Sequence, residues 1–92
     1  MSTKFEEYEA KYMFEELGYV RQDIQILGHK VIRYIKVEDD SRFVIQFEYQ
    51  GHFIRCYYDD KEFEEKRTFG LEIKELQAIN KQVEELEWNK ND

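Results

Sequence analysis

The chain has 92 residues, which is enough for one domain, residues 1–92, with a single modest core. Its formal net charge is −7, from 21 acidic and 14 basic side chains, and this balance disfavours nonspecific binding to nucleic acid or to an anionic membrane. A single cysteine, Cys56, excludes an internal disulfide and indicates a cytoplasmic protein. No apolar run approaches the roughly 20 residues that span a bilayer, and the N-terminus has no signal-peptide pattern.

The first predicted element is a helix over Ser2–Leu17. Its apolar side chains, among them Phe5, Tyr8 and Tyr12, recur at three- and four-residue spacing with glutamates between them. Gly18 follows and suits the left-handed conformation of the residue just past a helix end.

Two strands are predicted after this helix. Residues 19–27 mix apolar and polar side chains and are predicted to form an edge strand, and residues 28–29 turn the chain. Residues 30–37 are predicted to form a second strand that is covered in part on both faces, with Arg33 as the polar exception on its first face. The first face carries Val31, Ile35 and Val37, and the second carries Ile32 and Tyr34.

The most regular pattern predicts a β-hairpin over residues 42–58 that turns at residues 50–51. Its residues alternate with a period of two, which is typical of strands with one buried face. Glutamine rarely adopts the positive φ that a type I′ turn needs at its first position, so a longer loop is the alternative. The two-residue turn gives a core face of Phe43, Ile45, Phe47, Tyr49, His52, Ile54, Cys56 and Tyr58. The other face carries Val44, Phe53, Tyr57 and a cross-strand polar cluster of Gln46, Glu48 and Arg55.

The C-terminal third predicts a turn, a strand and a helix. Residues 59–65 are acidic and predict a turn or a short helical turn, and alternating apolar residues predict a last strand over residues 67–73. Residues 74–88 predict a helix with outward-facing glutamates, including Glu75 and Glu85. Its predicted buried stripe consists of Ile73, Leu76, Ile79, Val83 and Leu86.

The order of these elements indicates the fold class. A helix, four or five consecutive strands and a second helix follow one another without β-α-β alternation. This order predicts an α+β fold, in which an antiparallel β-meander of four to five strands is flanked by an N-terminal and a C-terminal helix.

An antiparallel meander brings the acidic turns at residues 38–41 and 59–65 to the same end of the sheet. Such an anionic end is one candidate surface for binding a basic partner protein. Two solvated turns are the alternative, because turn residues are often acidic or small. The candidate residues at this end are Glu38, Asp39, Asp40, Asp59, Asp60 and Glu62.

A second candidate surface is the sheet face opposite the core face. It combines aromatic side chains with an arginine, as hot spots of protein interfaces often do, and such groups also stack single-stranded bases. The alternative is that the first helix or residues 59–66 cover this face. A homodimer through this face or through an exposed strand edge is compatible with either interpretation. The candidate residues are Tyr34, Phe53, Arg55 and Tyr57.

No cofactor, metal site or enzymatic activity is expected. His29 and His52 fall at the sheet end opposite the acidic turns, but a typical zinc site needs three or four ligands. Cys56 faces the predicted core, where a cysteine is usually an inert apolar residue. The chain has no glycine-rich phosphate loop and no nucleophile elbow.

Two segments carry a resemblance to known proteins: MFEELGY at residues 13–19 and ELQAINKQVEELEW at residues 75–88. With them, the chain resembles small proteins without known activity that are encoded by phages and prophages of Gram-positive bacteria. Glu87 stands where the resemblance leads us to expect a glycine. The resemblance implies a bacterial cytoplasm and carries over no site residue. We therefore expect a non-enzymatic protein-binding module of phage or prophage origin, with single-stranded nucleic-acid binding as the alternative.

Overall fold

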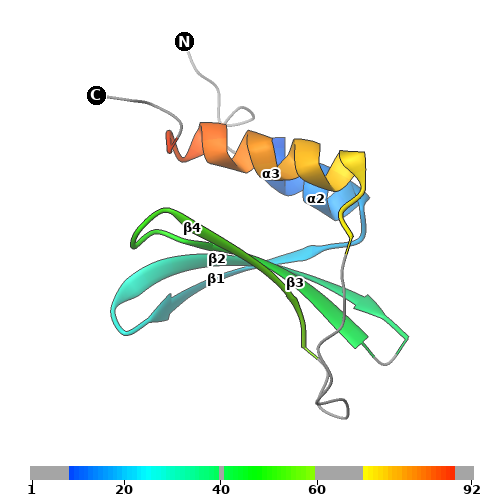
Figure 1. The fold of residues 1–92 in the computed structure, drawn as a ribbon, viewed down its shortest axis with the longest axis horizontal. Coiled ribbons are helices and arrows are strands. Elements are labelled where there is room, and N and C mark those ends of the chain that lie inside the picture. Colours follow the sequence, from blue (N-terminus) through cyan, green and yellow to red (C-terminus); the bar gives the residue numbers. More distant parts are fainter. Residues whose placement is uncertain (1–8, 40, 60–69, 89–92) are drawn as a thin grey trace. The chain divides into compact units, whose positions relative to one another are not determined.

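The structure is a computed structural model that describes residues 9–39, 41–59 and 70–88 (Figure 1). The described elements fall into two compact units, a helical unit and a sheet unit. The helical unit contains α2 (Glu9–Glu16) and α3 (Ile73–Glu85), and the sheet unit contains β1 (Val20–Ile26), β2 (His29–Glu38), β3 (Ser41–Glu48) and β4 (Phe53–Tyr58).

The sheet unit is a four-stranded antiparallel meander in the order β1-β2-β3-β4. The predicted α+β fold, with consecutive antiparallel strands between two helices, is confirmed with four strands. Ile26 pairs with His29 and Glu38 pairs with Ser41, so only two residues connect the strands at each of these turns. Such short connections leave little freedom in how neighbouring strands align.

The hairpin of β3 and β4 has the predicted register. Phe47 pairs with Ile54, as a two-residue turn requires. The His52 N–H donates a hydrogen bond to the Tyr49 carbonyl oxygen over 3.4 Å and closes that turn. Within the turn Gly51 has a φ of 81°, which glycine adopts at low cost, and the following His52 has a φ of 51°.

The register gives the sheet two faces. The tyrosine face consists of Arg21, Asp23 and Gln25 of β1, Lys30, Ile32, Tyr34, Lys36 and Glu38 of β2, Ser41, Phe43, Ile45 and Phe47 of β3, and Ile54, Cys56 and Tyr58 of β4. The opposite face is called the arginine face, after its three arginines. It consists of Val20, Gln22, Ile24 and Ile26 of β1, His29, Val31, Arg33, Ile35 and Val37 of β2, Arg42, Val44, Gln46 and Glu48 of β3, and Phe53, Arg55 and Tyr57 of β4.

The prediction that grouped Tyr34 with Phe53, Arg55 and Tyr57 is wrong. Tyr34 pairs with Ile45 and therefore lies on the tyrosine face, where its ring is fully buried. Its ring meets that of Phe47 edge to face, with 6.0 Å between the ring centres. Alternation along β2 shows only which of its residues share a side. The two-residue turn after β2 decides on which face of the whole sheet each of these two sets of residues lies.

Strand β3 is buried on both of its faces. Phe43, Ile45 and Phe47 are buried on the tyrosine face, as predicted for the core face of the hairpin. Val44 and Gln46 are buried on the arginine face as well. On the arginine face, Arg33 of β2 and Tyr57 of β4 both contact the buried Gln46.

Polar contacts join the start of α2 to the end of α3 in the helical unit, where α2 lies behind α3 in Figure 1. The backbone N–H of Ala10 donates to the Glu85 carboxylate over 2.8 Å. The first N–H groups of a helix have no partner within the helix, so this carboxylate satisfies one of them. Lys81 lies 3.1 Å from the Glu9 carboxylate, and the hydrogen bond to Glu9 raises the pKa of Lys81.

The buried stripe of α3 differs from the predicted one. Of the predicted residues only Ile79 is buried, while Ile73 and Leu76 are exposed. Two polar side chains predicted to face outward are drawn inward by bonds to backbone groups. Glu75 accepts the Glu72 N–H over 2.8 Å in a capping box, and Glu85 accepts the Ala10 N–H. The buried residues of α3 are Glu75, Ala78, Ile79 and Gln82.

Several predicted segments reach beyond the described residues. Residues 2–8 of the predicted first helix, residues 60–65 of the acidic turn and residues 67–69 of the predicted last strand lie outside them. Within the described part, residues 70–72 form no strand, and Ile73 begins α3 instead of ending a strand. Neither α2 nor α3 has the length and apolar character that crossing a membrane requires.

Helix α3 ends in a Schellman motif. The Trp88 N–H donates to the Val83 carbonyl over 3.1 Å, and the Glu87 N–H donates to the Glu84 carbonyl over 3.0 Å. Glu87 takes the left-handed position of this motif, with a φ of 62°. This is the position at which the resemblance to phage proteins leads us to expect a glycine.

We predict that Glu87→Gly raises the free energy of unfolding by about 0.5–1 kcal/mol, because glycine adopts a positive φ without the clash of a Cβ atom. Urea denaturation followed by circular dichroism measures the change. Glu84→Gly is the matched control, since it removes the same charge from a helical position of α3. It should lower the free energy of unfolding by about 1 kcal/mol. A loss of stability in both variants would contradict the assignment of the helix end.

We predict that Phe47→Ala lowers the free energy of unfolding by about 3–5 kcal/mol, because it empties a fully buried site beside the Tyr34 ring. Phe53→Ala is the control on the paired strand and the opposite face, where the side chain is 51% exposed. Its expected loss is about 1 kcal/mol or less. Equal losses in urea denaturation would show that the two faces are assigned wrongly.

Candidate functional site

Gln46 lies at the centre of the arginine face. It pairs across the sheet with Arg33 of β2 on one side and with Arg55 of β4 on the other, so the three residues form one row. Gln46 is only 5% exposed. Its Oε1 accepts hydrogen bonds from the Arg33 Nε and the Tyr57 hydroxyl, both at 3.1 Å, and its Nε2 donates to the Glu48 carboxylate over 3.0 Å. These bonds satisfy a buried polar group and fix its neighbours in place.

Arg55 connects this network to the edge strand β4. Its Nε donates to the same Glu48 oxygen that Gln46 contacts. Its guanidinium carbon lies 5.0 Å from the centre of the Phe53 ring, in a cation–π contact. The predicted polar cluster of Gln46, Glu48 and Arg55 is therefore confirmed. The structure adds Arg33 and Tyr57 to it.

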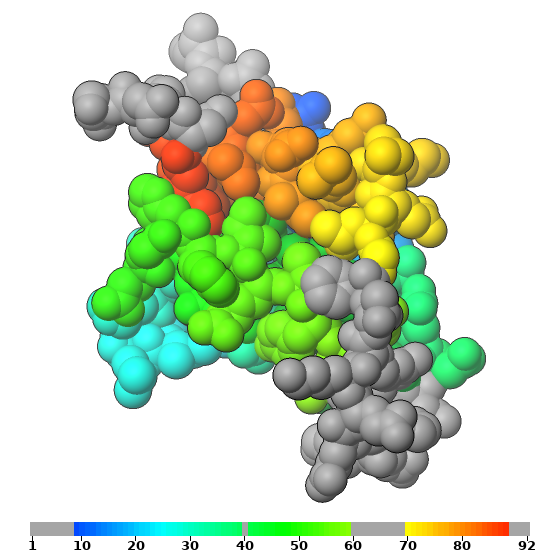
Figure 2. Space-filling view, in the orientation of Figure 1, coloured from blue at the N-terminus to red at the C-terminus, as the bar shows by residue number. Residues whose placement is uncertain are grey.

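The network lines an open hollow of about 670 Å³, called the Gln46 hollow. The hairpin of β3 and β4 that carries much of it is part of the near surface in the space-filling view (Figure 2, green). Apolar and aromatic side chains surround the polar groups, so the hollow offers both kinds of contact. Its lining consists of Ile26, Arg33, Gln46, Glu48, Phe53, Ile54, Arg55, Cys56 and Tyr57.

The charge of the arginine face is opposite in sign to that of the whole chain. The strands place Arg33, Arg42, Arg55 and the Glu48 carboxylate on this face, and Asp59, just after β4, pairs with Arg42, so these groups together leave one positive charge. The chain as a whole has a formal net charge of −7. Local charge, more than net charge, decides which groups a surface attracts at close range.

Exposed apolar side chains gather on the same face. Leu27, in the turn beside it, is 94% exposed and has a φ of 52°. That conformation costs a leucine about 1–2 kcal/mol, and the exposed side chain offsets none of it by burial. Within the described strands, no large apolar side chain of the tyrosine face is exposed. Those exposed in the strands are Val20, Ile26, Val37 and Phe53, all on the arginine face.

The acidic end of the sheet is partly neutralised by basic side chains. The Asp59 N–H donates to the Arg42 carbonyl over 2.7 Å, which places Asp59 near the turn after β2. The Arg42 guanidinium also donates to the Asp59 carboxylate over 2.7 Å, and Lys36 lies 3.2 Å from Glu38. With Asp39 in the turn, the described part of this end has three carboxylates and two basic groups. The candidates Asp40, Asp60 and Glu62 lie outside the described residues.

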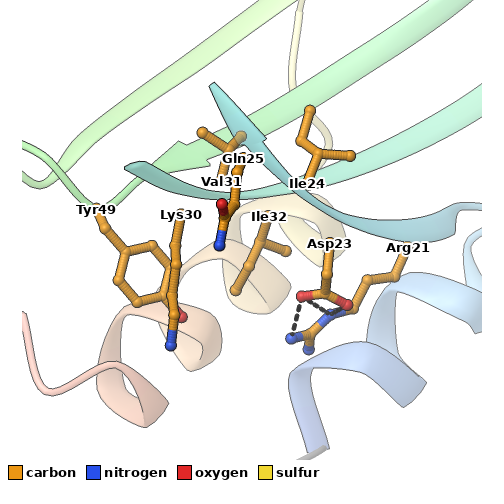
Figure 3. A pocket seen from close by; sticks show the side chains of 8 residues that line it. All are labelled: Arg21, Asp23, Ile24, Gln25, Lys30, Val31, Ile32 and Tyr49. Atoms are coloured by element: carbon orange, nitrogen blue, oxygen red, sulfur yellow. Dashed lines mark hydrogen bonds and ion pairs between the residues drawn. The ribbon is translucent and has the colours of Figure 1, made fainter. Parts of the chain in front are cut away.

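A second hollow, of about 410 Å³, involves strands β1 and β2 (Figure 3). In it Arg21 and Asp23 form an ion pair of 2.9 Å, and in Figure 3 both point to the same side of the strands as Tyr49. Burial raises the pKa of the Tyr49 phenol, although the Arg21 charge opposes the shift. Because Arg21 and Asp23 neutralise each other, this hollow is a weaker candidate than the Gln46 hollow.

The histidines and the cysteine form no site among the described residues. His29 and His52 both lie at the sheet end opposite the acidic turns, as predicted. Across residues 9–39, 41–59 and 70–88, no three His, Cys, Asp or Glu side chains are grouped so that they could hold a metal ion. Cys56 is half-buried.

Sequence analysis missed the two residues that complete the site. Arg33 was visible as the one polar residue on an apolar face of its strand, and this signal could have identified it. Ile26 was predicted only as part of an edge strand. It lines the Gln46 hollow together with Phe53, although the two residues lie on the opposite edge strands β1 and β4.

Comparison of this chain with protein-family models, with curated proteins and with solved structures found no match.

We predict that Gln46→Met lowers the free energy of unfolding by about 1–3 kcal/mol, because it leaves the Arg33 Nε and the Tyr57 hydroxyl without their acceptor. Urea denaturation measures the loss. Gln22→Met is the matched control, since Gln22 is the exposed partner of Arg33 in the same row, and its expected change is about 0.5 kcal/mol or less.

A double-mutant cycle between Gln46 and Tyr57 tests whether these two residues belong to one network. Tyr57→Phe should cost less in the Gln46→Met background than in the unmodified protein, because the bond it removes is already lost there. Additive losses would contradict a shared network.

Proposed function

We propose that the chain is a non-enzymatic protein-binding module and that its binding surface is the arginine face. The observation that carries this proposal is the gathering of every exposed large apolar side chain of the described strands on that face, around a fixed polar network. A monomer gains nothing from such an arrangement, because exposed apolar groups cost free energy in water. A partner that buries them recovers that free energy.

The composition of this face supports a protein partner over a nucleic acid. Three of its four exposed apolar residues, Val20, Ile26 and Val37, are aliphatic and cannot stack on bases. They can be buried against apolar side chains of another protein. Single-stranded nucleic acid is the second candidate, supported by Arg55 over the Phe53 ring and by the excess of arginine on this face. Tyr34, which was predicted to contribute, is buried on the other face.

The acidic end of the sheet is a weaker candidate for the same function. Two of its three described carboxylates have a basic neighbour at 2.7–3.2 Å. Such exposed pairs reduce the local field that would attract a basic partner.

The resemblance to small phage and prophage proteins supplies the biological setting of the proposal. In that setting the partner is a protein of a Gram-positive host, or of the phage, in the bacterial cytoplasm. A module of this size that binds such a protein needs no cofactor and no catalytic group.

The test is site-specific photo-crosslinking in lysate of a Gram-positive bacterium. Benzoylphenylalanine placed at position 53 lies on the arginine face, and the same residue placed at position 25 lies exposed on the tyrosine face. We predict a discrete protein adduct from position 53 and none from position 25. Val20→Ser together with Val37→Ser should reduce the yield at position 53, because both remove apolar contact area from that face.

Other outcomes of this experiment decide between the alternatives. An adduct from position 25 alone would overturn the assignment of the face. A nuclease-sensitive adduct from position 53 would favour single-stranded nucleic acid. If Asp39→Lys with Asp59→Lys abolishes the adduct and the valine changes do not, the acidic end is the binding surface.

A further inference from the structure

We propose that the Gln46 hollow recognises a carboxylate side chain of the partner, an aspartate or glutamate next to an apolar residue. This inference rests on the proposed function, since it names the chemistry that the arginine face selects. The carboxylate would lie between the guanidinium groups of Arg33 and Arg55.

The register places these two arginines on either side of Gln46 on one face of the sheet. Neighbouring strands lie about 4.8 Å apart, so the Cα atoms of Arg33 and Arg55 are separated by about 10 Å. Two long side chains that rise from such positions can reach one carboxylate held above the residue between them. Arg33 and Arg55 also line the same hollow.

The inner nitrogen of each guanidinium is already used within the protein. The Nε of Arg33 donates to the Gln46 Oε1, and the Nε of Arg55 donates to Glu48. Among the described residues, no hydrogen bond involves the terminal Nη groups of either arginine. The side chains are thus held in place while their outer donors stay available, so binding a ligand costs less conformational entropy.

The charges at this position fit a single carboxylate. Two guanidinium groups and the Glu48 carboxylate leave one positive charge, which one further carboxylate neutralises. Arginine binds carboxylates through paired, charge-assisted hydrogen bonds. A phosphate group carries more negative charge and would be repelled more strongly by Glu48, so it fits less well.

The walls of the hollow specify the residue next to the carboxylate. Phe53 is half-exposed, and Arg55 holds its ring on one side. Ile26 lines the same hollow and is exposed as well. An apolar side chain beside the carboxylate would be buried against both, which adds apolar contact to the charge-assisted bonds.

The test uses the full-length protein labelled with ¹⁵N and two capped peptides, acetyl-Glu-Leu-Glu-Leu-amide and its matched control acetyl-Gln-Leu-Gln-Leu-amide. The arginine Nε–Hε signals report directly on the proposed contacts. We expect the acidic peptide to shift the signals of Arg33 and Arg55 and to leave that of Arg21, on the other face, unchanged. The glutamine peptide should shift none of them.

Variants test the same contacts through affinity. Arg33→Gln and Arg55→Gln should each raise the Kd of the acidic peptide at least about tenfold, because each removes a charged hydrogen-bond donor. Arg21→Gln is the matched control and should change the Kd less than about twofold, a difference of about 0.4 kcal/mol. Since Arg33 supports Gln46, its variant is accepted only if the amide spectrum stays dispersed. The exposed Arg55 provides the independent variant.

Three outcomes would overturn the inference. The first is no shift of Arg33 and Arg55 at about 10 mM acidic peptide, a concentration that detects a Kd of about 1 mM. The second is an equal shift with both peptides. The third is a shift with oligo-deoxythymidine at low salt and none with the acidic peptide. The first two leave the proposed function intact where position 53 gives a nuclease-resistant protein adduct, so failure of the carboxylate inference is distinct from failure of that function. The third also favours the nucleic-acid alternative.

Discussion

The alignment of the four strands is the constraint on which the sheet unit depends. Turns of two residues connect β1 to β2 and β2 to β3, and a short turn connects β3 to β4. A slip of one residue at any of them would move every side chain of the next strand to the opposite face. A slip at the turn between β3 and β4 would move Arg55 to the tyrosine face. A slip at the turn between β2 and β3 would move Glu48 to that face and Phe47 away from it. The observed register places Phe43, Ile45 and Phe47 on one face of β3 and Gln46 and Glu48 on the other.

The register also explains why a glutamine can occupy a buried position in the central part of the sheet. Gln46 is a partner of Arg33 on one side and of Arg55 on the other. It has both a carbonyl oxygen and an amide group, so it can accept from Arg33 and Tyr57 while it donates to Glu48. A buried side chain with only one kind of polar group would leave one of these neighbours unsatisfied. The network thus holds two arginines in fixed positions on a face whose other prominent feature is exposed apolar surface.

The helical unit also contains inward-facing polar side chains that are satisfied by hydrogen bonds. Glu75 and Glu85 face inward because each accepts a backbone N–H at the start of a helix. Burial of a carboxylate is costly unless such hydrogen bonds are made. An apolar stripe read from helical periodicity cannot anticipate this, since it assumes that only apolar side chains are drawn inward. Ile73 and Leu76, by contrast, are exposed where a buried stripe was predicted.

The sequence by itself determined the class of fold, the four strands of the sheet, the C-terminal helix and the hairpin register. Alternation with a period of two identifies strands, and the shortest turn at Gln50 and Gly51 is enough to pair Phe47 with Ile54. The cluster of Gln46, Glu48 and Arg55 followed from that pairing, because its residues lie on two strands joined by one turn. Only local geometry is needed for such conclusions.

The tertiary structure alone decided which residues of different strand pairs share a face. Tyr34 belongs to the tyrosine face and Arg33 to the arginine face because of the turn between β2 and β3, which the sequence pattern of β2 does not encode. The gathering of exposed apolar residues on one face likewise depends on all the pairings at once. The sequence also could not show that Lys36 and Arg42 partly neutralise the acidic end, since salt bridges form between side chains whose positions the whole sheet sets. Periodicity shows which residues of one strand share a side, and only the complete register shows which sides of different strands form one face of the sheet.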